Sequence, residues 1–180
     1  ATTPKIPLWA LMLSTQLLDV AFVPLLLTGI ETLEPVEGAA TYGGSVIHAD
    51  YSHSLVGALV LALIAGLLAW RFWGRQGGLV IGSMVMSHWV LDLLVHRPGM
   101  PLLPGNAGNF PLMGLGLWQL PWLSATIELI LIVAGAILYA KSLSRYRKHG
   151  SNGKGAPALW AVIAMTVLLV TALATNVIGL

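Results

Sequence analysis

Five long apolar segments run through the sequence, and they restrict the fold more than any other feature. A helix needs roughly 20 mostly apolar residues to cross the hydrocarbon core of a bilayer. Five segments are long enough, at about residues 7–30, 51–73, 78–96, 121–140 and 156–179. The gaps between them hold no soluble domain, so residues 1–180 are expected to form a single domain. The sequence therefore predicts an all-α integral membrane protein with five transmembrane helices.

Composition supports a membrane protein and excludes other classes. Only 9% of the residues are charged and 57% are hydrophobic, whereas soluble domains carry about 25% charged residues. The 9 basic residues nearly balance the 7 acidic ones, which argues against a nucleic-acid partner. The chain has no cysteine, so disulfides and cysteine zinc sites are excluded. The first apolar run is too long for a signal-peptide core, and we expect it to be a retained span.

The basic residues predict the orientation in the membrane. Lysine and arginine in short loops collect on the cytoplasmic side. In a five-span chain one side holds Arg97 alone, and the other side holds Lys5, Arg71, Arg75, Lys141, Arg145, Arg147, Lys148 and Lys154. The N-terminus is therefore expected in the cytoplasm and the C-terminus outside, in the periplasm. Residues 31–50, an acidic loop, and residues 97–120, rich in proline and glycine, then face outward.

The string SHWVLDLLVH, residues 87–96, carries three ionisable side chains within an apolar segment. His88, Asp92 and His96 follow one another at steps of four residues, so a helix places them along one slowly turning stripe. His88 and His96 lie about 12 Å apart along the axis, which is too far for both to bind one ion easily. Asp92 with either histidine has the i, i+4 spacing that helical metal motifs use.

His53, in the string YSHSL, opens the second expected span at the surface where the third span ends with His96. His53, Asp92 and His96 should therefore share a level near the outer headgroups. Two imidazoles and a carboxylate suit a divalent ion, zinc in particular, with one position left open for water. We predict these three residues as metal ligands. His48 and Asp50, just before this helix, are candidates for further ligands, and Asp50 also for a base.

A second, deeper level is expected around His88. Asp19 and Gln16 on the first span and Glu128 on the fourth fall at similar depths. A charged group at the bilayer centre costs about 2.5–3.5 kcal/mol, so such groups are favoured where they face one another. They can support ligand histidines, or they can form interhelical hydrogen bonds worth about 0.6–2 kcal/mol each. The sequence leaves both roles open.

Four strings give the chain a family resemblance: PLLLTGIE, YSHSLVGALV, SHWVLDLLVHRPGMPLLP and GLGLW. They resemble a bacterial family of small polytopic inner-membrane proteins known as membrane-bound metal-dependent hydrolases. The likeness covers about residues 10–140, and its most specific part is the SHWxLDxxVHRP motif. The resemblance implies that His53, His88, Asp92 and His96 are metal or catalytic residues and that the protein lies in the bacterial inner membrane.

The sequence departs from this family at Gly99, where the string HRPGMPL has glycine in place of an acid. Losing that carboxylate removes a candidate ligand or general base, and Asp50 or Glu31 are the nearby acids that could replace it. We expect metal binding to survive this change more readily than catalysis, so enzymatic activity stays open. Residues 156–179 lie outside the resemblance and are expected to pack against lipid or another membrane subunit.

These observations favour two classes of function. The first is a metal-dependent hydrolase that acts at the outer face on an amphiphilic or lipid-linked substrate, with His88, Asp92 and Asp50 as catalytic residues. The alternative is a non-catalytic accessory subunit of a larger membrane complex, in which the polar stripe fixes helix register. A proton path through Asp19 and Glu128 is disfavoured, because no ionisable residue continues it to the cytoplasm.

Overall fold

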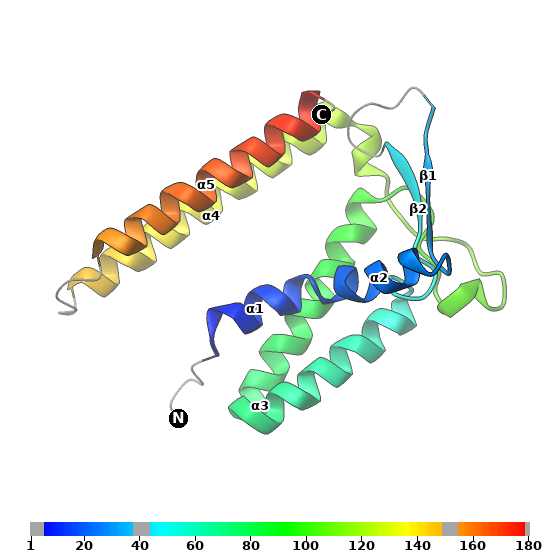
Figure 1. Ribbon diagram of the computed structural model, residues 1–180, viewed down its shortest axis with the longest axis horizontal. Helices are drawn as coiled ribbons and strands as arrows, with labels where there is room; N and C mark the ends of the chain where they lie inside the picture. The colour runs from blue at the N-terminus through cyan, green and yellow to red at the C-terminus, as the bar shows by residue number, and fades with distance from the viewer. Residues whose placement is uncertain (1–5, 38–43, 149–154, 179–180) are drawn as a thin grey trace. The chain divides into compact units, whose positions relative to one another are not determined.

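The protein is mostly helical, with two short strands (Figure 1). The computed structural model describes residues 6–37, 44–148 and 155–178. The chain divides into two compact units: among the described residues, the first reaches to Trp118 and the second begins at Gln119. The first unit holds all the side chains of the candidate site described below.

The first expected span is a bent pair of helices, α1 (Leu8–Thr15) and α2 (Leu17–Leu27). The break falls at Gln16, whose backbone leaves the helical region at φ −111° and ψ 7°. The two helices meet at 52°. Because Thr15 is the last residue of α1, its carbonyl has no acceptor role within that helix and is free to bind another group.

The sequence analysis describes residues 31–50, after α2, only as an acidic loop. The structure has two short strands within this segment. β1 (Thr32–Pro35) pairs antiparallel with β2 (Ser45–His48). Thr32 lies opposite His48 in this register. The strands join the end of α2 to the start of the next helix.

The second and third expected spans form a single element, α3 (Leu55–Val95), which is a helical hairpin with its turn at Gly74 (Figure 1). Gly74 has φ 70° and ψ −179°, a conformation that glycine adopts readily because it has no Cβ atom. The two arms touch where small residues face each other. A Cβ atom on Gly78 would lie 2.6 Å from the carbonyl oxygen of Gly66.

Residues 97–118 fold back over the open end of the α3 hairpin. Pro101 and Leu102 accept hydrogen bonds from the amides of Leu55 and Val56, the first residues of α3. At the other end of α3, the His96 carbonyl accepts from Gly116. The loop thus supplies partners for backbone groups that a helix end leaves unpaired, and it ties the start of α3 to its end.

A buried apolar cluster joins α2 to both arms of α3. Leu18, Ala58 and Val85 are fully buried in it, and Met100 of the folded-back loop completes it. Trp89 packs in the same cluster, and its indole N–H donates to the carbonyl of His53 at 2.8 Å. This packing places the residues before α3 against the second arm, next to the histidine stripe.

The second unit contains α4 (Pro121–Lys148) and α5 (Gly155–Ile178), which run antiparallel side by side (Figure 1). Among the described residues, α3 and α4 are long and apolar enough to cross a membrane, and the bent pair α1–α2 adds a third candidate if it forms one span. Within α5, which is 24 residues long, the described stretch Thr166–Thr175 is apolar. The five-span arrangement therefore stays a prediction.

Close contact between the arms of α3 predicts that Gly78→Ala destabilises the protein. The added methyl group would meet both the Gly66 carbonyl and the Trp70 side chain, at 2.6 and 2.9 Å. We expect a loss of about 1–3 kcal/mol, the usual cost of overpacking. Thermal unfolding in detergent, followed by circular dichroism, measures it.

Gly135→Ala on α4 is the matched control, because nothing lies within 4 Å of the Cβ atom it would add. It should be neutral or stabilise the helix by about 0.5–1 kcal/mol. Equal stability of the two variants would show that the arms of α3 do not depend on this close approach.

Candidate metal centre

Five polar side chains, from α2 and from the two ends of α3, border one cavity of about 300 Å³ in the first unit. Asp19 comes from α2, and His53 lies two residues before α3. His88 and Asp92 stand on the second arm of α3, and His96 caps its end. The apolar walls of the cavity are Phe22, Ile47 and Trp118.

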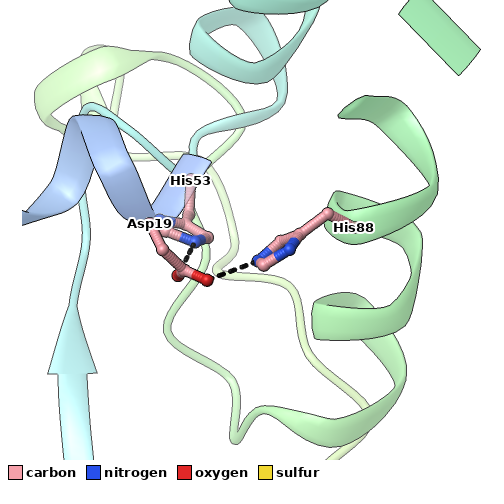
Figure 2. A group of neighbouring side chains, drawn as sticks. All are labelled: Asp19, His53 and His88. Atoms are coloured by element: carbon pink, nitrogen blue, oxygen red, sulfur yellow. Dashed lines mark ion pairs between the residues drawn. The ribbon is translucent and has the colours of Figure 1, made fainter. Parts of the chain in front are cut away.

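The histidine and aspartate side chains converge on one point. Oδ2 of Asp92 lies 3.0 Å from Nε2 of His88 and 3.3 Å from Nε2 of His53. Asp19 approaches the same two nitrogens from the other side, at 3.6 Å from His53 and 3.5 Å from His88 (Figure 2). One ligand atom from each of Asp19, His53 and His88 lies within 4.8 Å of the others, close enough to surround a metal ion.

Outer hydrogen bonds orient both histidines toward this point. Nδ1 of His88 lies 2.5 Å from the carbonyl oxygen of Thr15, at the break between α1 and α2. A carbonyl oxygen can only accept, so this bond puts a proton on Nδ1, and in the neutral ring the Nε2 lone pair then faces the aspartates. Nδ1 of His53 lies 2.8 Å from the hydroxyl of Ser52. Partners of this kind commonly fix the tautomer of histidines that bind metals.

His96 borders the cluster at greater distance. Its Nε2 atom is 3.8 Å from Oδ1 of Asp92, and its ring stacks against His53 at 6.5 Å. The ring of Trp118 covers it at 4.7 Å. His96 follows the last residue of α3 and so lies beyond the spanning helix, and its burial lowers the pKa of its imidazole. The neutral ring that results can accept a hydrogen bond.

The atoms that meet in the cavity suit a cation. Oδ2 of Asp92 is buried, and no hydrogen bond reaches it from the part of the chain that the structure describes. An ionised carboxylate and an imidazole Nε2 lone pair both accept and neither donates. Nitrogen and oxygen donors of this type bind zinc and related divalent ions. The residues present therefore fit a metal ion.

The expected separation of the polar residues into two levels is wrong. His53, placed at the outer level from the sequence, and His88, placed deeper, both contact Asp19 and Asp92. Distance along the axis separates the Cα atoms of His88 and His96, but their side chains both lean toward Asp92 between them. Glu128 belongs to the second unit.

The acids and the histidine expected from the outer loop lie elsewhere. Asp50 does not line the described cavity; its carbonyl accepts a hydrogen bond from Gly105. His48 pairs with Glu34 across the two strands at 3.4 Å. Glu31 is fully buried behind Ser52 and away from the cavity lining. Ser54 caps α3, because its hydroxyl accepts from the amide of Gly57 at the start of the helix.

Two contributors were not foreseen from the sequence, the Thr15 carbonyl and the Trp118 ring, and Glu31 was expected only as a replacement for the acid missing at Gly99. Thr15 acts through a backbone atom, which no residue pattern reveals. Trp118 stands in the string GLGLW, which the sequence linked only to the family resemblance. Glu31 gave one signal, a lone acid directly after an apolar span, but nothing in the spacing linked it to Ser52, which follows 21 residues later.

The fold and the cluster together define a polytopic helical membrane protein with a buried His/Asp centre. The chain belongs to the YdjM inner membrane protein family, whose model matches residues 2–177. This match confirms the resemblance to the membrane-bound metal-dependent hydrolases and places the protein in the inner membrane. It also corrects the view that residues 156–179 lie outside the family. A search of the curated proteins and one of the solved structures gave no match.

Proposed function

We propose that this protein is a membrane-embedded hydrolase whose divalent ion, zinc in our assignment, is held by Asp19, His53, His88 and Asp92. The observation that carries the proposal is the convergence of acceptor atoms on Oδ2 of Asp92. When both imidazoles are neutral, as metal ligation requires, their Nε2 lone pairs and the carboxylate at 3.0–3.3 Å repel one another unless positive charge lies among them. A metal ion supplies that charge and also accounts for the outer hydrogen bonds on both imidazoles.

A divalent ion in this position would act as a Lewis acid that lowers the pKa of a water molecule and polarises the bond to be cleaved. The chain supplies the rest of the site. Asp19 and Asp92 balance the charge, and Thr15 holds the ring of His88 in place. His96 and Trp118 border the cavity beside the cluster, where we assign them to contact with the substrate.

The substrate we propose is amphiphilic or lipid-linked, with a small polar group at the reacting end. A cavity of about 300 Å³ holds a headgroup rather than a whole lipid. Its apolar walls suit an ester or phosphoester flanked by hydrocarbon. The side chain of Asp19 is 48% exposed, so the cluster is open to an entering group.

The missing acid at Gly99 does not remove the carboxylates that an ion needs. Asp19 and Asp92 already face the two histidines. A Cβ atom on Gly99 would lie 3.6 Å from the carbonyl oxygens of Arg97 and Ile47, so a side chain there would start in ordinary contact beside the cavity wall. This supports retained metal binding.

Orientation and span number remain part of the proposal. With five spans and a cytoplasmic N-terminus, as the distribution of lysine and arginine favours, the cluster opens toward the outer face. The accessory-subunit alternative was motivated in part by a fifth span foreign to the family, and the match to residues 2–177 removes that motive.

The proposal predicts that full-length protein purified in mild detergent without chelators carries stoichiometric zinc. His53→Ala and His88→Ala should each weaken zinc binding by at least about 100-fold, since losing even an outer partner of a ligand costs about 10–100-fold. Elemental analysis and zinc titration measure this. His48→Ala is the control, because His48 contacts Glu34 on the strands instead. Metal-free wild-type protein would refute the proposal.

His96→Ala is expected to keep its zinc and to lose substrate contact. With p-nitrophenyl acyl esters and phosphodiesters as probes, turnover should fall by about 100-fold or more, the usual result of misplacing a bound substrate. Zinc content is measured on the same samples. Loss of zinc in this variant would instead return His96 to the ligand set, as the sequence predicts.

A further inference from the structure

We propose that Glu31 is a positioning residue which, acting through Ser52, keeps the proton of His53 on Nδ1 and turns Nε2 toward the cation site. The inference rests on the proposed metal centre for its purpose. Its evidence is separate, because it comes from a chain of three side chains outside the cavity.

Glu31 is a buried carboxylate with a full set of donors. Glu31 lies shortly after the end of α2, and the residue is only 1% exposed. Oε1 accepts hydrogen bonds from the backbone amides of Tyr51 and Ser52, both at 2.8 Å. Burying a charge is costly unless it is hydrogen-bonded, and two amides with a hydroxyl meet that condition. Glu31 thereby fixes the segment that carries His53 to the end of α2.

The order of the bonds sets where the protons lie. The Ser52 hydroxyl has one proton, and it lies 2.9 Å from Oε2 of Glu31 and 2.8 Å from Nδ1 of His53. An ionised carboxylate only accepts, so the hydroxyl donates its proton to Glu31. Ser52 can then only accept from His53. The proton of the neutral imidazole is therefore on Nδ1, and Nε2 presents a lone pair.

His53 and His88 are oriented in the same way, each by a hydrogen bond from its Nδ1 atom, although their acceptors differ. Nδ1 of His88 donates to the carbonyl of Thr15, and Nδ1 of His53 donates to Ser52. Both Nε2 atoms then point at Asp92, at 3.0 and 3.3 Å. In the other tautomer, Nε2–H of His53 would donate to an aspartate and close the site to a cation. Glu31 excludes that tautomer.

Glu31→Gln reverses the chain while keeping its shape. The amide oxygen can still accept from the backbone of Tyr51 and Ser52, so the fold should persist. The NH₂ group takes the place of Oε2, the nearer acceptor at 2.9 Å, against 3.1 Å for Oε1. It donates to the Ser52 hydroxyl, which we then expect to donate to Nδ1 of His53. The proton of His53 moves to Nε2. Such a change in protonation is one that a merely structural role for Glu31 would not produce.

The test uses full-length, zinc-free protein with ¹⁵N-labelled histidine in nanodiscs, at a pH raised until the His53 signals are those of a neutral ring. His53→Ala identifies the His53 signals. Wild-type protein should show the pattern of an Nδ1–H imidazole, and Glu31→Gln that of an Nε2–H imidazole. In a separate zinc titration, Glu31→Gln should bind about 10–100-fold more weakly, the usual loss for an outer partner.

Glu34→Gln is the matched control, because it makes the same chemical change three residues later on an exposed carboxylate that pairs with His48. It should leave the His53 signals and zinc affinity unchanged. Ser52→Ala gives a second, independent variant. It removes the hydroxyl that connects Glu31 to His53 and leaves the Glu31 side chain itself unchanged. It should yield a mixture of His53 tautomers together with weaker zinc binding.

An Nδ1–H signal and wild-type zinc affinity in both Glu31→Gln and Ser52→Ala would overturn the inference. Absence of zinc binding by wild-type protein would overturn the proposed function instead. The tautomer measurement would still decide the role of Glu31 in that case, because it is made without metal.

Discussion

A buried carboxylate between imidazoles is the constraint on which the rest of this structure depends. Asp92 stands in an apolar helix, where a lone charge is expensive, and its Oδ2 atom accepts no hydrogen bond from the described chain. Nε2 of His88 and Nε2 of His53 lie 3.0 and 3.3 Å from this atom, while the Nδ1 atoms of both rings are bound to other groups. Such a group is costly in a membrane protein unless positive charge balances it, and a cation bound among these side chains, as we propose, would supply that charge.

Helix ends, rather than helix middles, provide the precision of this centre. The break at Gln16 frees the Thr15 carbonyl for His88. His53 lies just before α3 and His96 just after it, and the folded-back loop binds the backbone at both ends. Irregular backbone within a membrane protein is tolerated where protein covers it or a cavity adjoins it. Here the residues just before and just after α3, His53 and His96, line one cavity, and the break between α1 and α2 binds His88, which lines the same cavity.

Much of this could be predicted from sequence, and the remainder fails for identifiable reasons. Apolar length predicted the helices, and four-residue spacing predicted the stripe of His88, Asp92 and His96. The division into two levels failed because the rise per residue of a helix locates Cα atoms only. The side chains of His53, His88 and His96 reach across the two levels and meet at Asp92, which lies between them. The strands in the acidic loop carry no strong periodic signal. Glu31 was beyond prediction because its link to Ser52 is a tertiary contact.

Gly99 stands where the family resemblance leads us to expect an acid, and its replacement leaves the carboxylates that face the histidines in place. A side chain there would start 3.6 Å from the carbonyl oxygen of Ile47, a residue of the cavity wall. The two acids that touch the histidines come from α2 and from the middle of the stripe, and both are present. The orientation of the histidines depends on Thr15 and Ser52, which lie away from Gly99 in the sequence. In the proposed metal centre neither the ligands nor their outer partners include position 99, so we expect the glycine to affect the binding of a substrate more directly than the binding of the ion.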